Sequence, residues 1–251
     1  MRQTLVIARR ELLSFFISPV AYVLLLVWLL FSGISFYYLV VVFSSQPMGA
    51  SASATPLSLF FGGTTLFYLP LFLFAPIMTM RLIAEERSSG TLEPLLTIPL
   101  GEVSLVLGKY LAAMCFWATL WVPTLVYVWI ASSAGQGAID KGTLGATYLG
   151  IFCIGLFYMA IGLLMSAVSR NQIVAATLTF MVLAGLFLLG LGGYVFTDDQ
   201  ARGIFEYIGI WSQMDAFSKG IVDTRYLVFD LSLAFLGVFL SIRAVQANRW
   251  Q

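Results

Sequence analysis

The sequence predicts an all-α polytopic membrane protein with six transmembrane helices, built as a single domain over residues 1–251. Of the 251 residues, 60% are hydrophobic and 10% are charged, and the mean hydropathy is +0.95. A soluble domain carries about 25% charged residues, so this chain has too few charges to cover a water-facing surface. It also has no histidine, which excludes His-dependent triads, zinc proteases and histidine proton shuttles.

Long runs without Asp, Glu, Lys or Arg locate the spans. The first run extends from residue 12 to 80, and others cover residues 110–139, 142–169, 171–197 and 231–242. A spanning helix needs about 20 apolar residues, so the first run holds two helices and the next three hold one each. The last run is shorter, and it makes a sixth span if Asp230 lies near an interface. The predicted spans are 19–43, 57–80, 106–131, 144–168, 173–196 and 226–245.

Residues 1–18 precede the first span and have a helical pattern of their own. Leu5, Ala8, Leu12, Phe15 and Phe16 recur on one side, while arginines occupy the other. This pattern predicts an amphipathic helix in the interface, with its apolar stripe toward acyl chains and its arginines toward anionic headgroups. A simple positive anchor is the alternative interpretation. The Ser-Pro pair at 18–19 ends this helix.

The distribution of positive residues predicts the orientation. With the N-terminus inside, nine Lys and Arg residues lie on the inner side and four on the outer side. Cytoplasmic flanks carry the excess of positive charge. We therefore expect a multi-pass protein of the inner (plasma) membrane with both termini in the cytoplasm.

Prolines lie inside two of the predicted spans. Pro70 and Pro76 fall in the second span and Pro123 in the third. Neighbouring helices can satisfy the carbonyl groups that a proline frees within a membrane. These prolines therefore predict kinks and not breaks.

The polar segment after the second span, residues 81–99, carries its own helix signals. Arg81 and Glu85 are four residues apart, so the second span is expected to continue into the cytoplasm as a helix with an ion pair on one side. Ser89-Gly90 predicts a helix stop and Thr91 the N-cap of a second short helix. That helix would present Leu92, Leu95 and Leu96 on one face, which suits docking into a groove on a partner.

The run RLIAEERSSGTLEPLLTIP at residues 81–99 resembles the cytoplasmic signature of ABC-2-type permeases, the membrane subunits of one class of ABC exporters. In that family, the segment between the second and third spans carries a coupling helix that sits on the ATPase subunit. The six spans and the amphipathic N-terminal helix match the family layout over essentially the whole chain. A second run, WSQMDAFSKGIVDTR at 211–225, resembles the motif before the sixth span in the branch that includes gliding-motility permeases. Tyr226 stands where that branch would have an acidic residue.

The resemblance implies which residues face the ATPase, within a cytoplasmic coupling segment at 81–102. They are Glu85, Glu86, Arg87, Gly90, Thr91, Glu93, Leu95 and Leu96. Leucines would supply the buried anchor of that contact and charges on its rim would set its orientation. The alternative is that these acidic residues only solvate a loop.

The chain shows no ATP site of its own. Gly108-Lys109-Tyr110 lacks both the Ser or Thr after the lysine and the preceding GxxxxG of a P-loop. Lys109 is better interpreted as a residue at the start of the third span that reaches the cytoplasmic headgroups. We therefore expect no cofactor in this chain, and we expect ATP and Mg on a partner ATPase. The other expected partners are a second permease copy or paralogue and membrane lipid.

Residues 197–225 form an outer polar loop with a helical recurrence of apolar residues, interrupted at Gly209 and Gly220. This pattern predicts two short helices at the outer interface, and the resemblance implies re-entrant helices that cap the exit of the pathway. Asp223 and Arg225 are expected to pair with each other or with helix ends. The sequence pattern of this loop is equally compatible with a structural lid and with a substrate contact. Its candidate gate residues are Trp211, Phe217, Gly220, Asp223 and Arg225.

Elimination narrows the function further. No charge lies deep in any predicted span, whereas ion-coupled transporters usually place ionisable groups there. An amphipathic or lipid-linked substrate therefore fits better than a small ion. A role in assembling an envelope complex also fits better. The net charge of +1 is too small to create an electrostatic field that attracts nucleic acid. An ATP-independent secondary transporter or channel would leave residues 81–99 unexplained. An intramembrane enzyme would lack histidine, paired aspartates and a serine with a nearby base, so no catalytic or metal-binding residue is predicted.

Overall fold

The computed structural model describes residues 2–45, 59–63, 65–90, 101–133, 140–195 and 199–248, and these residues contain no strand. A π-helical turn, η1, covers Leu59–Gly63. The α-helices are α1 (Arg2–Ile17), α2 (Pro19–Ser45), α4 (Thr65–Thr79), α5 (Ala84–Ser88), α7 (Glu102–Trp121), α8 (Thr124–Ser133), α9 (Lys141–Val168), α10 (Gln172–Val195), α11 (Asp199–Ile208), α12 (Ile210–Ser218) and α13 (Thr224–Asn248).

Five stretches of helix are long and apolar enough to cross a membrane. They are Pro19–Val42, Glu102–Ser133, Lys141–Val168, Gln172–Gly193 and Thr224–Ala247. They correspond to the first, third, fourth, fifth and sixth predicted spans. The region predicted as the second span holds η1 and α4, and its apolar part, Pro70–Thr79, is a shorter helix.

The prolines behave in two ways. Pro70 and Pro76 lie inside α4, which continues through both of them. Pro123 lies in the turn between α7 and α8, where the amide groups of Leu125 and Val126 donate to the carbonyls of Val122 and Pro123. Proline interrupts the regular hydrogen bonding of a helix, and the third span is accordingly built from two helices.

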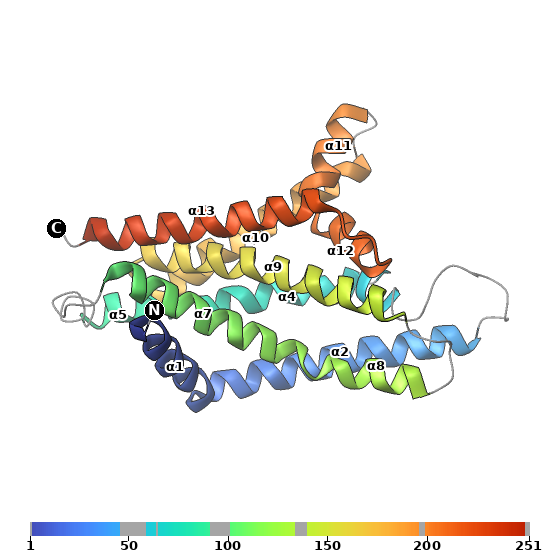
Figure 1. The fold of residues 1–251 in the computed structure, drawn as a ribbon, viewed down its shortest axis with the longest axis horizontal. Helices are drawn as coiled ribbons and strands as arrows, with labels where there is room; N and C mark the ends of the chain where they lie inside the picture. Colours follow the sequence, from blue (N-terminus) through green and yellow to red (C-terminus); the bar gives the residue numbers. More distant parts are fainter. Residues whose placement is uncertain are drawn as a thin grey trace.

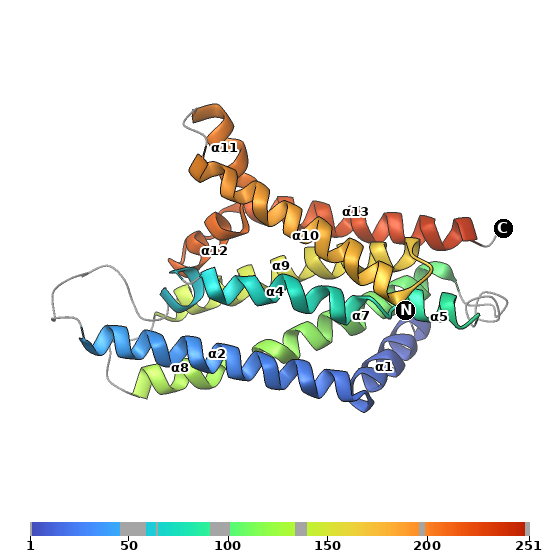
Figure 2. The ribbon, with the colours of Figure 1, turned by 180° about the vertical axis from the view of Figure 1, so that it is seen from behind.

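The helices form an elongated bundle in which most run along the long axis (Figure 1). The helix α9 is the most buried of the candidate spans, and it packs against α13, α12, α10, α4 and α7. The ends of the described chain, Arg2 and Asn248, lie at the same end of the bundle as α5 (Figure 2). The helices α11 and α12 lie at the opposite end.

Small residues allow the other helices to approach α9 closely. A Cβ added to Gly155 would lie 2.2 Å from Nε1 of Trp117 on α7, and one added to Gly162 would lie 2.1 Å from Oγ1 of Thr79 on α4. These distances leave no room for a methyl group. The glycines of α9 therefore permit the tight contacts that hold the bundle together.

The start of α9 has a capping aspartate. The carboxylate of Asp140 accepts hydrogen bonds from the backbone amides of Gly142 and Thr143, at 3.2 and 3.1 Å, and from the hydroxyl of Thr143 at 2.8 Å. These bonds satisfy amide groups that have no partner within the helix. The hydroxyl of Thr143 and the two amides lower the pKa of Asp140 below its ordinary value.

The helix α1 forms where the sequence pattern predicts it, but three residues of its predicted stripe, Leu12, Phe15 and Phe16, face protein, while Leu5 is exposed. The rings of Phe15 and Phe16 lie 5.1 and 5.6 Å from the ring of Phe116 on α7, and Leu12 packs against the core. For Leu12, Phe15 and Phe16, the expectation that the stripe faces acyl chains is therefore wrong. The reason is that α7 offers an aromatic surface that buries the same residues more completely.

Candidate functional site

The segment that follows α4 is fixed to α9 by a buried serine. The hydroxyl oxygen of Ser166 accepts hydrogen bonds from the backbone amides of Ile83 and Ala84, each at 3.0 Å, and the hydroxyl donates to the carbonyl of Met80 at 3.2 Å. Residues 80–83 form a turn, so the helix predicted to continue from the second span is interrupted there. The serine supplies polar contacts that the turn itself lacks, and it holds the first residue of α5 against α9.

A second contact joins α5 to the end of α9. One guanidinium nitrogen of Arg87 donates to the carbonyls of Ala167 and Val168, both at 3.3 Å. The last carbonyls of a helix have no partner within it and carry partial negative charge. Arg87 therefore binds α9 at the point where a cation is most favourable.

The third contact is a buried cluster of three charges. Nζ of Lys109, on α7, lies 2.8 Å from Oε1 of Glu86 and 3.1 Å from Oε1 of Glu11 on α1. The lysine side chain is 1% exposed. The expectation that Lys109 reaches the headgroups is therefore wrong, because two carboxylates from other helices surround its ammonium group.

Burial affects the charge of this cluster. Desolvation raises the pKa of Glu86 above its ordinary value, and the ammonium group of Lys109 opposes that effect. A carboxylate in this position depends on its cation, since a buried charge without a partner is costly. The cluster therefore links the position of α5 to the positions of α1 and α7.

A fourth contact lies closer to solvent. Arg81 forms the predicted ion pair with Glu85, at 3.5 Å, and also donates to the hydroxyl of Ser18, between α1 and α2, at 2.9 Å. The side chain of Glu85 is half-exposed. Glu85 therefore faces outward while Glu86 faces inward.

These contacts define one structural unit, which we call the α5 clamp: Ser166, Arg87, Glu86, Lys109 and Glu11. Its members come from α9, α5, α7 and α1, far apart in the sequence. At the end of α5, Gly90 adopts a φ of +70°, a left-handed conformation that favours glycine. Four of the predicted coupling residues, Thr91, Glu93, Leu95 and Leu96, lie outside the described residues. The clamp fixes the point from which that segment starts.

The predicted gate residues lie at the opposite end of the bundle. Phe217 is fully buried against Gly150 of α9, and Trp211 is half-buried on the same helix, α12. The helix ends where Gly220 adopts a φ of +81°. A hydrogen bond of 3.3 Å from the hydroxyl of Thr147 to the carbonyl of Phe217 also ties α12 to α9.

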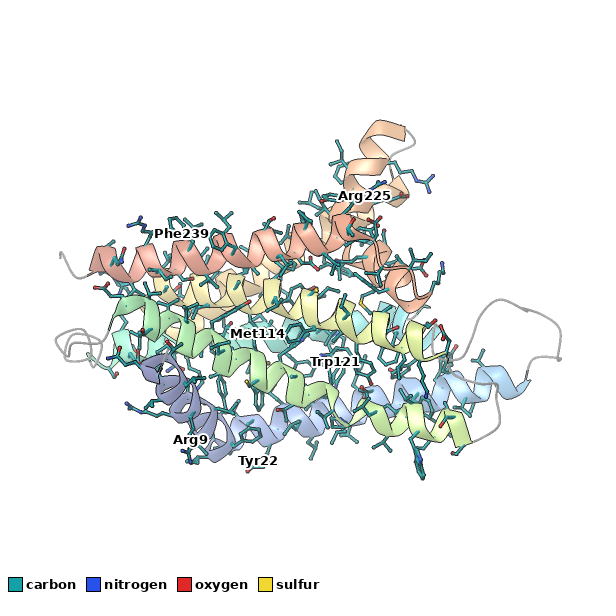
Figure 3. The ribbon with its side chains drawn as sticks, in the orientation of Figure 1. Arg9, Tyr22, Met114, Trp121, Arg225 and Phe239 are labelled. Carbon is teal, nitrogen blue, oxygen red and sulfur yellow. The ribbon has the colours of Figure 1, made fainter. Side chains whose placement is uncertain are left out.

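Asp223 and Arg225 mark the start of α13. The carboxylate of Asp223 accepts a hydrogen bond from the backbone amide of Arg225 at 2.9 Å and lies 3.9 Å from its guanidinium group. Both predicted interactions, pairing and helix capping, therefore occur. Figure 3 shows Arg225 near the α11 and α12 end of the bundle and Arg9 at the α5 end.

A buried polar pair also holds α12, and the sequence pattern did not identify it. The side-chain amide of Gln213 donates to Oδ2 of Asp230 on α13. Asp230 is fully buried, and its Oδ1 has no hydrogen-bond partner among the described residues. The signal in the sequence was one isolated acid within the last apolar stretch.

An apolar cavity lies between α7 and α9. Its volume is about 250 Å³, and its lining contains no charged residue. Aromatic rings contribute much of the surface, and one of them, Trp121, also packs against Trp28 of α2. The lining residues are Trp117, Ala118, Trp121, Val122, Leu125, Tyr148, Ile151 and Phe152.

Comparison with known protein families gives a match over most of the chain. The model of the family described as "ABC-2 family transporter protein" matches residues 60–242, which include α4, the α5 clamp except Glu11, and most of α13. A search of curated proteins finds no match. The matched region covers most of the chain, and the described structure holds five apolar helices long enough to span a membrane. The chain therefore belongs to the ABC-2 transporter family and is a multi-pass membrane permease of an ABC-type transporter.

Proposed function

We propose that this permease is driven by ATP hydrolysis on separate ATPase subunits, which bind the ATP and Mg, and that residues 81–102 transmit their movement. The observation that carries this proposal is the α5 clamp. If residues 81–102 were only a loop kept soluble by its acidic residues, they would not need buried contacts to three other helices. The clamp gives the segment a firm attachment to the spans.

The contacts of the clamp suit the transmission of force. A buried network of hydrogen bonds and ion pairs is more rigid than exposed polar contacts. Through Ser166 and Arg87 a movement of α5 acts on α9, the central helix of the bundle. Through Lys109 it acts on α7 and α1. Displacement of residues 91–100 by a partner would therefore reach several helices together.

The orientation follows from the same arrangement. We propose that the end of the bundle that carries α5 and both termini is cytoplasmic, in agreement with the excess of positive residues predicted there. An even number of crossings brings both termini to one side, so the region from residue 57 to 80 would complete six spans. The helices α11 and α12 would then lie at the outer side as re-entrant helices.

The proposed substrate is amphipathic or lipid-linked, and the proposed direction is export. The cavity between α7 and α9 supports an apolar substrate part, because its lining is apolar and aromatic. Two permease subunits, as identical copies or paralogues, would work with two ATPase subunits in the inner membrane. An envelope-complex assembly role would use the same coupling.

The coupling assignment can be tested with two matched charge reversals. Glu85 and Glu206 each form an ion pair with an arginine four residues earlier, and both are substantially exposed, but they lie at opposite ends of the bundle. The permease is co-expressed with candidate ABC ATPase subunits of the same organism and purified. Glu85→Arg and Leu95→Arg should reduce ATPase co-purification and ATP hydrolysis in liposomes, while Glu206→Arg should leave both unchanged.

Two outcomes would contradict the proposal. If Glu85→Arg and Leu95→Arg leave co-purification and hydrolysis unaltered, residues 81–102 do not couple the subunits. If the purified permease transports substrate in liposomes without ATP and without any ATPase subunit, it is a secondary transporter or channel subunit.

A further inference from the structure

The side of α1 that faces away from the bundle has a pattern of its own. Val6, Leu13 and Ile17 are 63%, 52% and 81% exposed. Positions seven and four residues apart lie on one face of a helix, so these three side chains form a continuous apolar stripe. Arg9 and Arg10 are consecutive and exposed, and they flank the stripe on its two sides.

The same residues line a shallow groove. Val6, Leu13 and Ile17 form its apolar part, Arg9 and Arg10 its basic part, and Ser14 completes the lining. In the described part of the chain, neither arginine has a carboxylate within ion-pair distance. The groove therefore presents two cations without a paired acid beside an exposed hydrocarbon surface.

The position of α1 indicates what covers this groove. The helix ends at Ile17, and the candidate span Pro19–Val42 begins two residues later. Figure 1 shows that α1 runs across the long axis of the bundle at the α5 end, and Figure 3 places Arg9 at its outer edge. In a membrane that Pro19–Val42 spans, the stripe would lie near the surface, where acyl chains meet headgroups.

We propose that this groove binds an anionic phospholipid, with Arg9 and Arg10 on the phosphate and the acyl chains over Val6, Leu13 and Ile17. Guanidinium groups bind phosphate oxygens with a matching fork of donors. The two arginines and the apolar stripe together favour this ligand. The arginines bind its phosphate group, and the stripe contacts its acyl chains. The site lies on the face of α1 opposite the stripe that packs on α7.

The bound lipid would adjoin the α5 clamp. Glu11, which follows Arg10 in the chain, is the clamp residue on α1, and the charge of Arg10 also acts on Glu86. One short helix thus carries lipid contacts outward and clamp contacts inward. Binding of lipid by the permease alone does not depend on the proposed ATP coupling, so the two can fail separately.

The test counts bound lipid on the full-length permease in detergent. Phosphatidylglycerol or phosphatidylcholine is titrated, and retained lipid is measured by native mass spectrometry. We expect Arg9→Gln/Arg10→Gln to weaken phosphatidylglycerol binding by at least about 5-fold, the effect of one basic residue near an anionic surface, and to leave phosphatidylcholine unchanged. Lys219→Gln/Arg225→Gln is the matched control, because it removes two exposed cations at the opposite end.

Two further variants and one competitor separate the contributions. Leu13→Gln/Ile17→Gln should also weaken phosphatidylglycerol binding, and Arg9→Lys/Arg10→Lys should retain most of it. Inorganic phosphate at matched concentration should leave the lipid bound. Circular dichroism of each variant checks that the helices remain folded.

Four results would overturn the proposal. The first is an equal loss in the Lys219/Arg225 control, which would show non-specific attraction. The second is unchanged lipid binding in the Arg9/Arg10 variant. The third is displacement by inorganic phosphate, which would show a free-anion site. The fourth is loss of ATPase co-purification in the Arg9/Arg10 variant with lipid binding intact, which would make the groove a protein-docking surface.

Discussion

Lys109 of α7 and Glu86 of α5 form a buried ion pair, with Nζ 2.8 Å from Oε1. The same ammonium group also binds Glu11 of α1 at 3.1 Å. One cation therefore pairs with carboxylates from two other helices, and neither carboxylate side chain is more than 22% exposed. Because the ammonium group itself is buried, the three helices depend on each other at this point.

Replacement of the lysine tests that dependence. Lys109→Met leaves two largely buried carboxylates without a cation, and the loss of one partner from a buried ion pair costs about 3–5 kcal/mol. For a protein of this size the expected decrease in Tm is roughly 6–20 °C. The measurement is thermal unfolding of the purified permease in detergent, followed by tryptophan fluorescence.

A matched lysine distinguishes burial from charge. Lys219 also pairs with a carboxylate, that of Asp215, at 2.5 Å, but its side chain is 56% exposed. Lys219→Met should therefore change stability by no more than about 1 kcal/mol. The triple variant Glu11→Gln/Glu86→Gln/Lys109→Met removes all three charges and should regain part of the loss. Equal effects of the two lysine variants would contradict the assignment of a buried cluster.

The pH dependence of stability tests the environment of Glu86. Burial raises its pKa in the folded state from the ordinary 4.5. The contribution of this protonation to stability is therefore fully present below about pH 4.5 and is lost as the pH rises through the folded-state pKa. Glutamine does not titrate, so the stability of the wild type relative to Glu86→Gln should fall as the pH rises.

Tm values of the wild type and Glu86→Gln, measured from about pH 4 to about pH 8, give this difference directly. Glu85→Gln is the control, because Glu85 lies in the same helix and is half-exposed. If the wild type instead becomes more stable relative to Glu86→Gln as the pH rises, the attraction of Lys109 outweighs burial and the direction of the pKa shift is wrong.

Charge-free runs and turn residues were sufficient to predict most of the helices. Pro19 begins α2, and Gly209 separates α11 from α12, as expected from backbone chemistry that is local in the chain. The ion pair between Arg81 and Glu85 is also local, since its two residues are one helical turn apart. The fold was predictable where the determining residues are near neighbours.

The clamp was not predictable, because its partners are distant in the sequence. Lys109 meets Glu11, 98 residues earlier, and Ser166 binds the amide of Ile83, 83 residues away. A lone lysine at the start of a span has the same local pattern whether it reaches headgroups or buried acids. The amphipathic pattern of α1 was similarly ambiguous, because a stripe of Phe and Leu suits both acyl chains and the aromatic surface around Phe116.

Removal of one hydroxyl tests the attachment of α5 to α9. Ser166→Ala leaves the buried amides of Ile83 and Ala84 without their acceptor, and each unsatisfied buried group costs about 1–3 kcal/mol. The expected result is a lower Tm and, under the proposed coupling, weaker ATP-dependent transport with the proposed ATPase subunits. Ser241→Ala is the matched control, because that buried hydroxyl donates only to the carbonyl of Gly237 in its own helix. Comparable losses in both variants would show that Ser166 has no special role.

The pair formed by Gln213 and Asp230 gives a last prediction, for the end of the bundle that carries α11 and α12. Asp230→Ala removes the acceptor of the buried Gln213 amide, which should cost about 1–3 kcal/mol and loosen α12 from α13. Asp230→Asn retains a carbonyl acceptor and should keep most of the stability. In Gln213→Leu/Asp230→Leu neither buried polar group remains, so this double variant should be more stable than Asp230→Ala. The measurement is a double-mutant cycle of Tm values that also includes the single variants Gln213→Leu and Asp230→Leu; if these two substitutions are additive, the two residues do not interact.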